Sequence, residues 1–207
     1  MSNPIEIPNH EKIILDLCGG TGSWSKPYLE AGYRVINVTL PEYDVRTYEP
    51  PAGVYGILAA PPCTMFSFAR MKAKLPRNLP EGMEIVKACL EIIWKCQYRT
   101  EKDTQKKPPL RFWALENPKG MLEWFLGKPA MMFQPYEYGN PYQKKTCLWG
   151  VFNIPPKLFL TGYYDAYFDK IPMCKLRELL NCDSTRQSEL RSVTPSGFAK
   201  AFFMANQ

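Results

Sequence analysis

Short apolar runs that end at or just before a glycine or a proline constrain the fold of this chain more than any other feature. Each run has the length and composition of a buried strand in a parallel sheet. The four runs occupy residues 12–20, 33–40, 55–60 and 110–118.

Two helical segments are predicted between these strands. Residues 23–32 have Ser23 or Ser25 near their start and Gly32 at their end. Residues 79–99 carry apolar side chains at the spacing of one helical face, namely Met83, Val86, Leu90, Ile93 and Trp94. The alternation of strands and helices predicts an α/β fold with a doubly wound, mostly parallel sheet.

The second half of the chain has a less regular pattern. Residues 146–152 are predicted to form a strand, whereas the proline- and aromatic-rich stretch that follows shows no clear period. The chain is predicted to end in a helix over residues 194–207, with Thr194 as its cap and Pro195 in its first turn.

Composition excludes several classes of protein. The 207 residues are 45% hydrophobic, enough for a core without disulfide bonds. The seven cysteines show neither a disulfide framework nor a zinc-ribbon spacing, so we expect free thiols in a reducing cytoplasm and no metal. No apolar span of about 20 residues predicts a membrane helix. The net charge of +6 favours a polyanionic partner mildly, and His10, the only histidine, is predicted to be a surface residue.

A glycine-rich turn follows the first predicted strand. In "LDLCGGTGSW" the strand ends at Asp16, and Gly19, Gly20 and Gly22 precede the helix. Such a turn lets the backbone pass close to a nucleotide-like ligand, although a tight turn alone also needs flexible residues. The spacing does not match a phosphate-binding loop.

Two further motifs stand at strand ends. In "AAPPCTMFS" the rings of Pro61 and Pro62 fix the backbone, so Cys63 leaves the strand with little freedom. In "ALENPKGM" Glu116 and Asn117 end another apolar strand. Carboxyl ends of parallel strands meet at one edge of a sheet, which is where ligands bind. A thiol and a carboxyl group there make a nucleophile paired with an acid.

These motifs, in this order, resemble those of the DNA cytosine-5 methyltransferases, particularly the short forms of bacteriophages. "DLCGGTGSW" is similar to the S-adenosylmethionine motif, "PPCTMFS" to the catalytic loop and "ENP" to the Glu-Asn motif. "YQKKTCLWG" resembles the motif with paired basic residues, and "LRSVTPSGFAKAF" resembles the late Thr-Pro motif.

The resemblance implies a reaction and its residues. The Cys63 thiolate adds to carbon 6 of cytosine, Glu116 hydrogen-bonds the ring, and carbon 5 accepts the methyl group from S-adenosyl-L-methionine. In duplex DNA the base must first leave the stack. Asn117 belongs to the catalytic set, and Lys145, Gln143 and Arg191 support the loop or the flipped nucleotide.

The cofactor residues implied by the same resemblance begin in the glycine motif. The full set is Asp16, Cys18, Gly19, Gly20, Gly22, Trp24, Asp44 and Pro61. Asp44 resembles the aspartate beside the adenine amine. Thr39 stands where the family has an acidic residue for the ribose, with Glu42 as a possible substitute, and lysines replace the usual paired arginines.

The domain organisation follows from the motifs. Residues 1–150 are expected to form the S-adenosylmethionine-binding catalytic domain, a Rossmann-like methyltransferase fold. Residues 151–190 form a reduced target-recognition segment, and residues 191–207 form a helix that packs back on the catalytic domain. The expected setting is the cytoplasm, of a bacterial host if the protein is encoded by a phage, and the expected partner is DNA.

Two alternatives remain open. Methyltransferases that modify amino groups of adenine or cytosine share the cofactor motif, but they place Asp-, Asn- or Ser-Pro-Pro and an aromatic residue where this chain has Ala60-Pro61-Pro62-Cys63. The second alternative is a methyltransferase-like DNA-binding protein without turnover, which the short recognition segment and the missing ribose acid favour.

Overall fold

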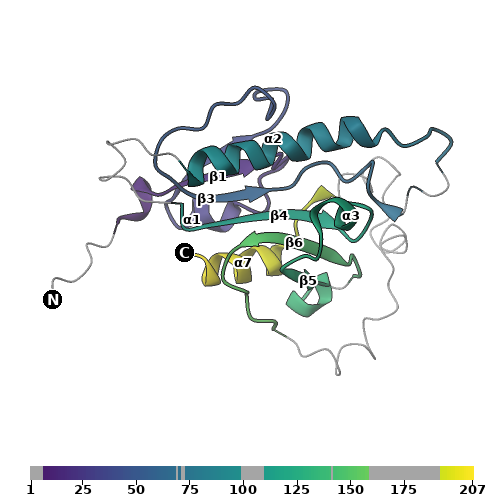
Figure 1. Cartoon of the computed structure of the whole chain (residues 1–207). Coiled ribbons are helices and arrows are strands. Elements are labelled where there is room, and N and C mark those ends of the chain that lie inside the picture. Colours follow the sequence, from purple (N-terminus) through teal and green to yellow (C-terminus); the bar gives the residue numbers. More distant parts are fainter. Residues whose placement is uncertain (1–6, 69, 71–72, 99–109, 141, 159–191) are drawn as a thin grey trace.

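The computed structural model describes residues 7–68, 70, 73–98, 110–140, 142–158 and 192–207 (Figure 1). Six strands form one sheet in the order β2-β1-β3-β4-β6-β5. Their bounds are Ile13–Leu17 for β1, Arg34–Val38 for β2, Val54–Ala59 for β3, Phe112–Pro118 for β4, Met131–Phe133 for β5 and Thr146–Val151 for β6.

The sheet is mostly parallel, as the sequence predicts. The first four strands are parallel to one another, with β1 between β2 and β3, and β3 beside β4. The last strand, β6, runs antiparallel to both β4 and β5 and lies between them. The mixed α/β architecture is therefore compatible with a Rossmann-like fold.

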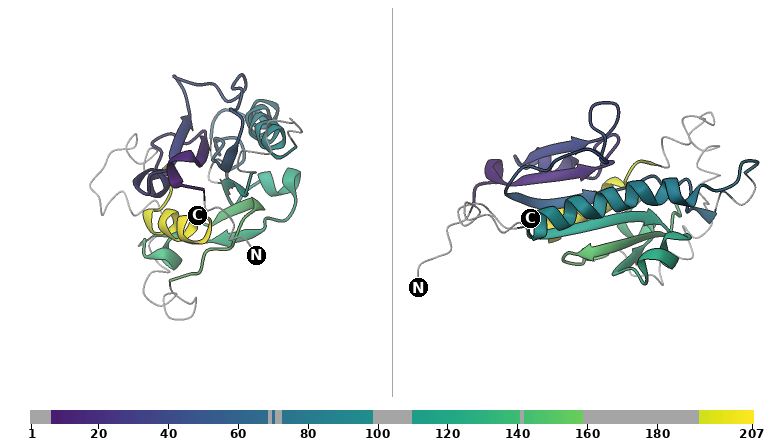
Figure 2. Two further views of the ribbon diagram at one scale, coloured as in Figure 1. Left: turned by 90° about the vertical axis from the view of Figure 1, so that its left-hand side faces the viewer. Right: turned by 45° about the horizontal axis from the view of Figure 1, so that its top comes forward.

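One face of the sheet is covered by α2, Leu79–Gln97 (Figures 1 and 2). The Asn78 side chain caps this helix by accepting a hydrogen bond from the Glu81 amide. The buried side of α2 packs on apolar residues of β1, β3 and β4, and it consists of Val86, Ala88, Cys89, Ile92 and Ile93. Because three strands are buried on both faces, their sequences are continuous apolar runs rather than alternating ones.

The opposite face is covered by α1, Lys26–Glu30, and α7, Ser196–Ala205. Figure 2 shows α7 on the other side of the strands from α2. Aromatic side chains fill this layer: Phe198 of α7 stacks on Phe133 at 3.8 Å between ring centroids, and Phe202 meets Trp24 edge to face at 5.4 Å. The helix at the end of the chain is thus part of the core.

Three details differ from the sequence predictions. The N-cap of α7 is Pro195, without a side-chain cap bond, so neither Thr194 as the cap nor Pro195 in the first turn is correct. The amide of Thr194 instead donates a hydrogen bond to the Ser23 hydroxyl at 2.9 Å. The short elements η1 (Asn9–Glu11), α3 (Leu122–Leu126), β5 and η4 (Pro135–Tyr138) had no periodic signal, because they span only three to five residues.

Most of the proposed target-recognition segment, from residue 159 to residue 190, lies outside the described residues, as does Arg191. Among the residues that the structure describes, no helix is both long and apolar enough to cross a membrane.

Candidate active site

A cavity of about 710 Å³ opens at the carboxyl ends of β1, β3 and β4. Its walls come from the glycine turn after β1, the Pro-Pro-Cys loop after β3, the end of β4, the segment before β6 and the segment before α7. All the sequence motifs therefore contribute to one cavity. Its volume is in the range of small-molecule and cofactor sites.

The glycine turn folds tightly around the end of β1. Cys18, Gly20 and Gly22 have φ values of 56°, 53° and 69°, in the left-handed region that side chains other than glycine rarely adopt. A Cβ atom at Gly19 would overlap the carboxyl group of Asp16 and the side-chain oxygen of Asn37. The turn therefore requires glycine at position 19 for space and at the other two positions for conformation.

Asp16 is fully buried beneath this turn and also lines the cavity. Its Oδ2 accepts a hydrogen bond from the Ser25 hydroxyl at 2.5 Å, while its Oδ1 has no partner among the described residues. Burial raises the pKa of Asp16 to about 6, and the bonds from Ser25 act in the opposite direction. A buried acceptor without a partner at a cavity wall is suited to a ligand that carries a hydrogen-bond donor.

Asn37 of β2 was not singled out from the sequence. Its Nδ2 donates to the carbonyl of Gly20 at 2.9 Å, and its buried Oδ1 likewise has no partner within the described part of the chain. The side chain fixes the glycine turn from the neighbouring strand. The only sequence signal was a polar residue inside an apolar strand.

The Pro-Pro-Cys loop is held at both ends. The fully buried Asn117 donates through Nδ2 to the carbonyl of Pro61 at 2.9 Å, which joins the end of β4 to the end of β3. The carbonyl of Cys63 accepts from the amides of Phe66 and Ser67 at 3.0 and 2.9 Å. The Arg77 guanidinium donates to the carbonyls of Met65 and Ser67. Asn117 therefore positions the loop rather than lining the cavity.

Cys63 itself is half-buried, lines the cavity and carries its sulfur as a thiol. Glu116 lines the same cavity from β4. Its carboxylate lies 3.6 Å from the Nζ of Lys144, and both side chains are largely buried, with exposed fractions of 13% and 14%. Burial and the charge of Glu116 raise the pKa of the adjacent Tyr142 to about 12. Thiol and carboxyl group thus face one cavity from neighbouring strands.

The two lysines before β6, Lys144 and Lys145, make different contacts. Lys144, which the sequence reasoning did not select, forms the ion pair with Glu116. Lys145 lines the cavity but is more exposed, and its carbonyl accepts from the amide of Lys119 at 2.8 Å. Gln143 also lines the cavity.

Three of the expected cofactor residues, Gly22, Trp24 and Asp44, do not line the cavity. Trp24 is 2% exposed and packs against α7 in the aromatic layer. Gly22 shapes the turn without lining the cavity. Cys18, Gly19, Gly20 and Pro61 do line it.

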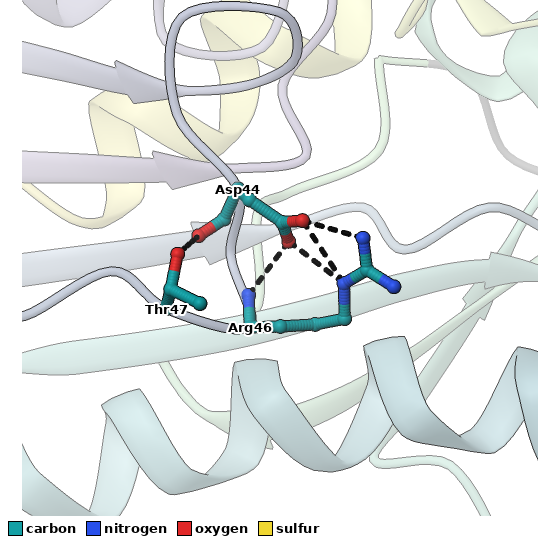
Figure 3. Close-up of polar contacts among 3 residues, drawn as sticks. All are labelled: Asp44, Arg46 and Thr47. Carbon is teal, nitrogen blue, oxygen red and sulfur yellow. Dashed lines mark hydrogen bonds and ion pairs between the residues drawn. The ribbon is translucent and has the colours of Figure 1, made fainter.

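Asp44 lies in the loop after β2 and does not line the cavity. Figure 3 shows its contacts with Arg46 and Thr47. Arg46 donates to it from both its guanidinium and its amide, and these bonds lower the pKa of Asp44 to about 2. The charge of Asp44 reaches the glycine turn, where it acts against the lowering of the Cys18 pKa. The larger effect on Cys18 is a hydrogen bond with Cys89 of α2, which lowers its pKa.

Neither a comparison with protein-family models nor a comparison with curated protein sequences gave a match. Within the described residues, no group of three or more His, Cys, Asp or Glu side chains is placed to hold a metal ion.

Proposed function

We propose that the protein methylates carbon 5 of cytosine in DNA, with S-adenosylmethionine as the methyl donor. The observation that carries this proposal is the convergence of Cys63, Glu116 and the glycine turn on one cavity. A nucleophile, an acid and a site for a nucleotide-like cofactor are the three components that the reaction needs.

The residues of the glycine turn fit the cofactor. The ammonium group of its methionine part offers donors, and the unpartnered Oδ1 of Asp16 is a buried acceptor at the cavity wall. The absence of a side chain at Gly19 and Gly20 leaves the turn open to a close backbone approach. When bound, the cofactor supplies an electrophilic methyl group on a sulfonium centre.

Cys63 makes the acceptor carbon reactive. Its thiolate forms a bond to carbon 6 of cytosine, and the electron pair of the 5,6 double bond moves toward the ring nitrogen, so carbon 5 becomes nucleophilic. After methylation, carbon 5 gives up its proton to a base, and the same electron pair expels the thiolate. The prolines and the bonds at the Cys63 carbonyl hold this loop in place and reduce the entropic cost of attack.

Glu116 stabilises the charge that develops on the ring. One carboxyl oxygen accepts from the exocyclic amine, and a proton shared between the other oxygen and the ring nitrogen relieves the negative charge. The nearby Lys144 orients the carboxyl group before the base arrives. Cys63 and Glu116 line a cavity, so a cytosine must leave the base stack of the duplex before both side chains can contact it.

Expression in a bacterial host tests this function directly. We expect bisulfite sequencing of the host DNA to detect 5-methylcytosine with the wild-type chain and not with Cys63→Ala. Unchanged 5-methylcytosine levels with soluble wild-type protein would contradict the proposal. Appearance of N6-methyladenine in place of 5-methylcytosine would assign the cavity to amino-group methylation.

A further inference from the structure

Two large aromatic side chains are exposed side by side at the edge of the candidate active site. Phe68 follows Cys63 by five residues and is 41% exposed, and Trp124 of α3 is 69% exposed. Their ring centroids are 6.3 Å apart and the planes are inclined by 58°. Apolar rings that remain exposed at a cavity mouth indicate a surface that a partner covers.

The segments that carry these rings are joined by backbone contacts. The amide of Met121 donates to the carbonyl of Phe66 at 2.9 Å, and Ser67 forms a β-bridge with Gly120. A Cβ atom at Gly120 would overlap the carbonyl of Phe66, so the close approach requires glycine. In the same two segments, the fully buried Phe66 packs edge to face on Phe125 at 6.4 Å between ring centroids. The pair therefore sits on a fixed support.

The charge beside the pair is positive. Phe68 lines the cavity together with four cationic residues, Arg70, Lys119, Lys144 and Lys145. Among the described residues, two carboxyl groups line the same cavity, Asp16 and Glu116, and Glu116 pairs with Lys144. A partner that fits both features has flat apolar rings attached to an anionic backbone, which describes an unpaired stretch of nucleic acid.

We propose that Phe68 and Trp124 form a stacking platform for an unpaired base of single-stranded DNA next to the target cytosine. This inference rests on the proposed function, which places the target base over Cys63. The platform holds the neighbouring nucleotide once the duplex is opened, and the cationic residues contact its phosphates. Stacking on aromatic side chains tolerates any base, so the platform contributes affinity rather than sequence selectivity.

The test measures binding of the full chain to a labelled single-stranded oligonucleotide of about 15 mixed-sequence nucleotides, by fluorescence anisotropy at one fixed salt concentration. We expect Phe68→Ala and Trp124→Ala each to weaken binding by about five-fold or more. Trp124→Phe keeps an aromatic face and should retain most of the affinity. Trp94→Ala is the matched control, because Trp94 is 52% exposed on α2 and does not line the cavity.

The outcomes separate the platform from the proposed methyl transfer. Weaker binding by both alanine variants, with unchanged thermal unfolding and an intact Trp94→Ala, supports the platform even if the wild type methylates nothing. Equal binding by all variants overturns the platform. If the wild type still methylates DNA in that case, the proposed function stands. A wild-type chain that binds no single-stranded DNA also overturns the platform.

Discussion

Asp16 shows how a single buried carboxyl group links stability to the candidate site. Because its pKa rises from 3.8 to about 6, the folded chain binds more protons than the unfolded chain between these values. Stability from this residue is therefore present at low pH and falls as the pH rises through about 6. The cost of the ionised form at neutral pH is about 3 kcal/mol.

Asp16→Asn removes this titration and keeps the shape of the side chain. We expect the free energy of unfolding of the wild type to fall by about 3 kcal/mol relative to Asp16→Asn between about pH 3 and pH 8. Urea unfolding of both chains across this range measures the difference. Parallel pH profiles for the two chains would show that Asp16 does not titrate in the folded state as described.

The two lysines before β6 provide a matched pair of substitutions. The Nζ of Lys144 lies 3.6 Å from the Glu116 carboxylate, whereas Lys145 is more exposed and its backbone carbonyl accepts a hydrogen bond from the Lys119 amide. We expect Lys144→Met to slow methyl transfer by about tenfold, because the Glu116 carboxyl group loses its orienting charge. Lys145→Met should slow it less. Single-turnover rates on the same DNA decide between them, and a reversed order would contradict the assignment.

At the scale of elements, the glycine turn combines two different requirements. Gly19→Ala places a methyl group against the Asp16 carboxyl and Asn37, whereas Gly20→Ala meets nothing within 4 Å and must only adopt a φ of +53°. We expect Gly20→Ala to cost about 1 kcal/mol of stability. Gly19→Ala should cost more, up to about 3 kcal/mol, because the neighbours must move. Urea unfolding measures both, and equal costs would refute the crowding described at Gly19.

The elements also show what the sequence could predict. The strands β1 to β4 and β6 and the helix α2 were predicted, because apolar runs and a helical stripe are local signals. The reversed direction of β6 and its place between β4 and β5 depend on pairings far apart in sequence. The direction of Lys144 toward Glu116 was not predictable either, since residues 143–145 precede the strand without a regular side-chain alternation.

Trp24 belongs to the glycine motif of the sequence, but its side chain is buried in the core and does not line the cavity. It lies two residues before α1 begins, and Tyr28 lies within that helix. Both are buried in the layer beneath α7. The partner that decides this, Phe202, lies near the end of the sequence, and no local pattern reveals the contact.

At the scale of the whole molecule, α7 completes the second core layer. Phe198 is fully buried and contacts Phe133, Tyr138 and Trp24. We expect Phe198→Ala to lower the free energy of unfolding by about 3–5 kcal/mol. Met204→Ala on the same helix, where the side chain is 64% exposed, should change it by less than about 0.5 kcal/mol. Similar small losses for both would contradict a structural role for α7.

The proposed chemistry depends on a covalent bond between Cys63 and a cytosine ring, and trapping that bond tests it most directly. DNA with 5-fluorocytosine blocks the last step, because fluorine cannot leave carbon 5 as a cation and the thiolate is not expelled. With S-adenosylmethionine, we expect wild type and Cys96→Ser to form a complex that survives denaturation, with the DNA attached at Cys63 by mass spectrometry. Cys63→Ala should form none. Absence of a complex with folded wild-type protein, or its persistence in Cys63→Ala, would contradict the account.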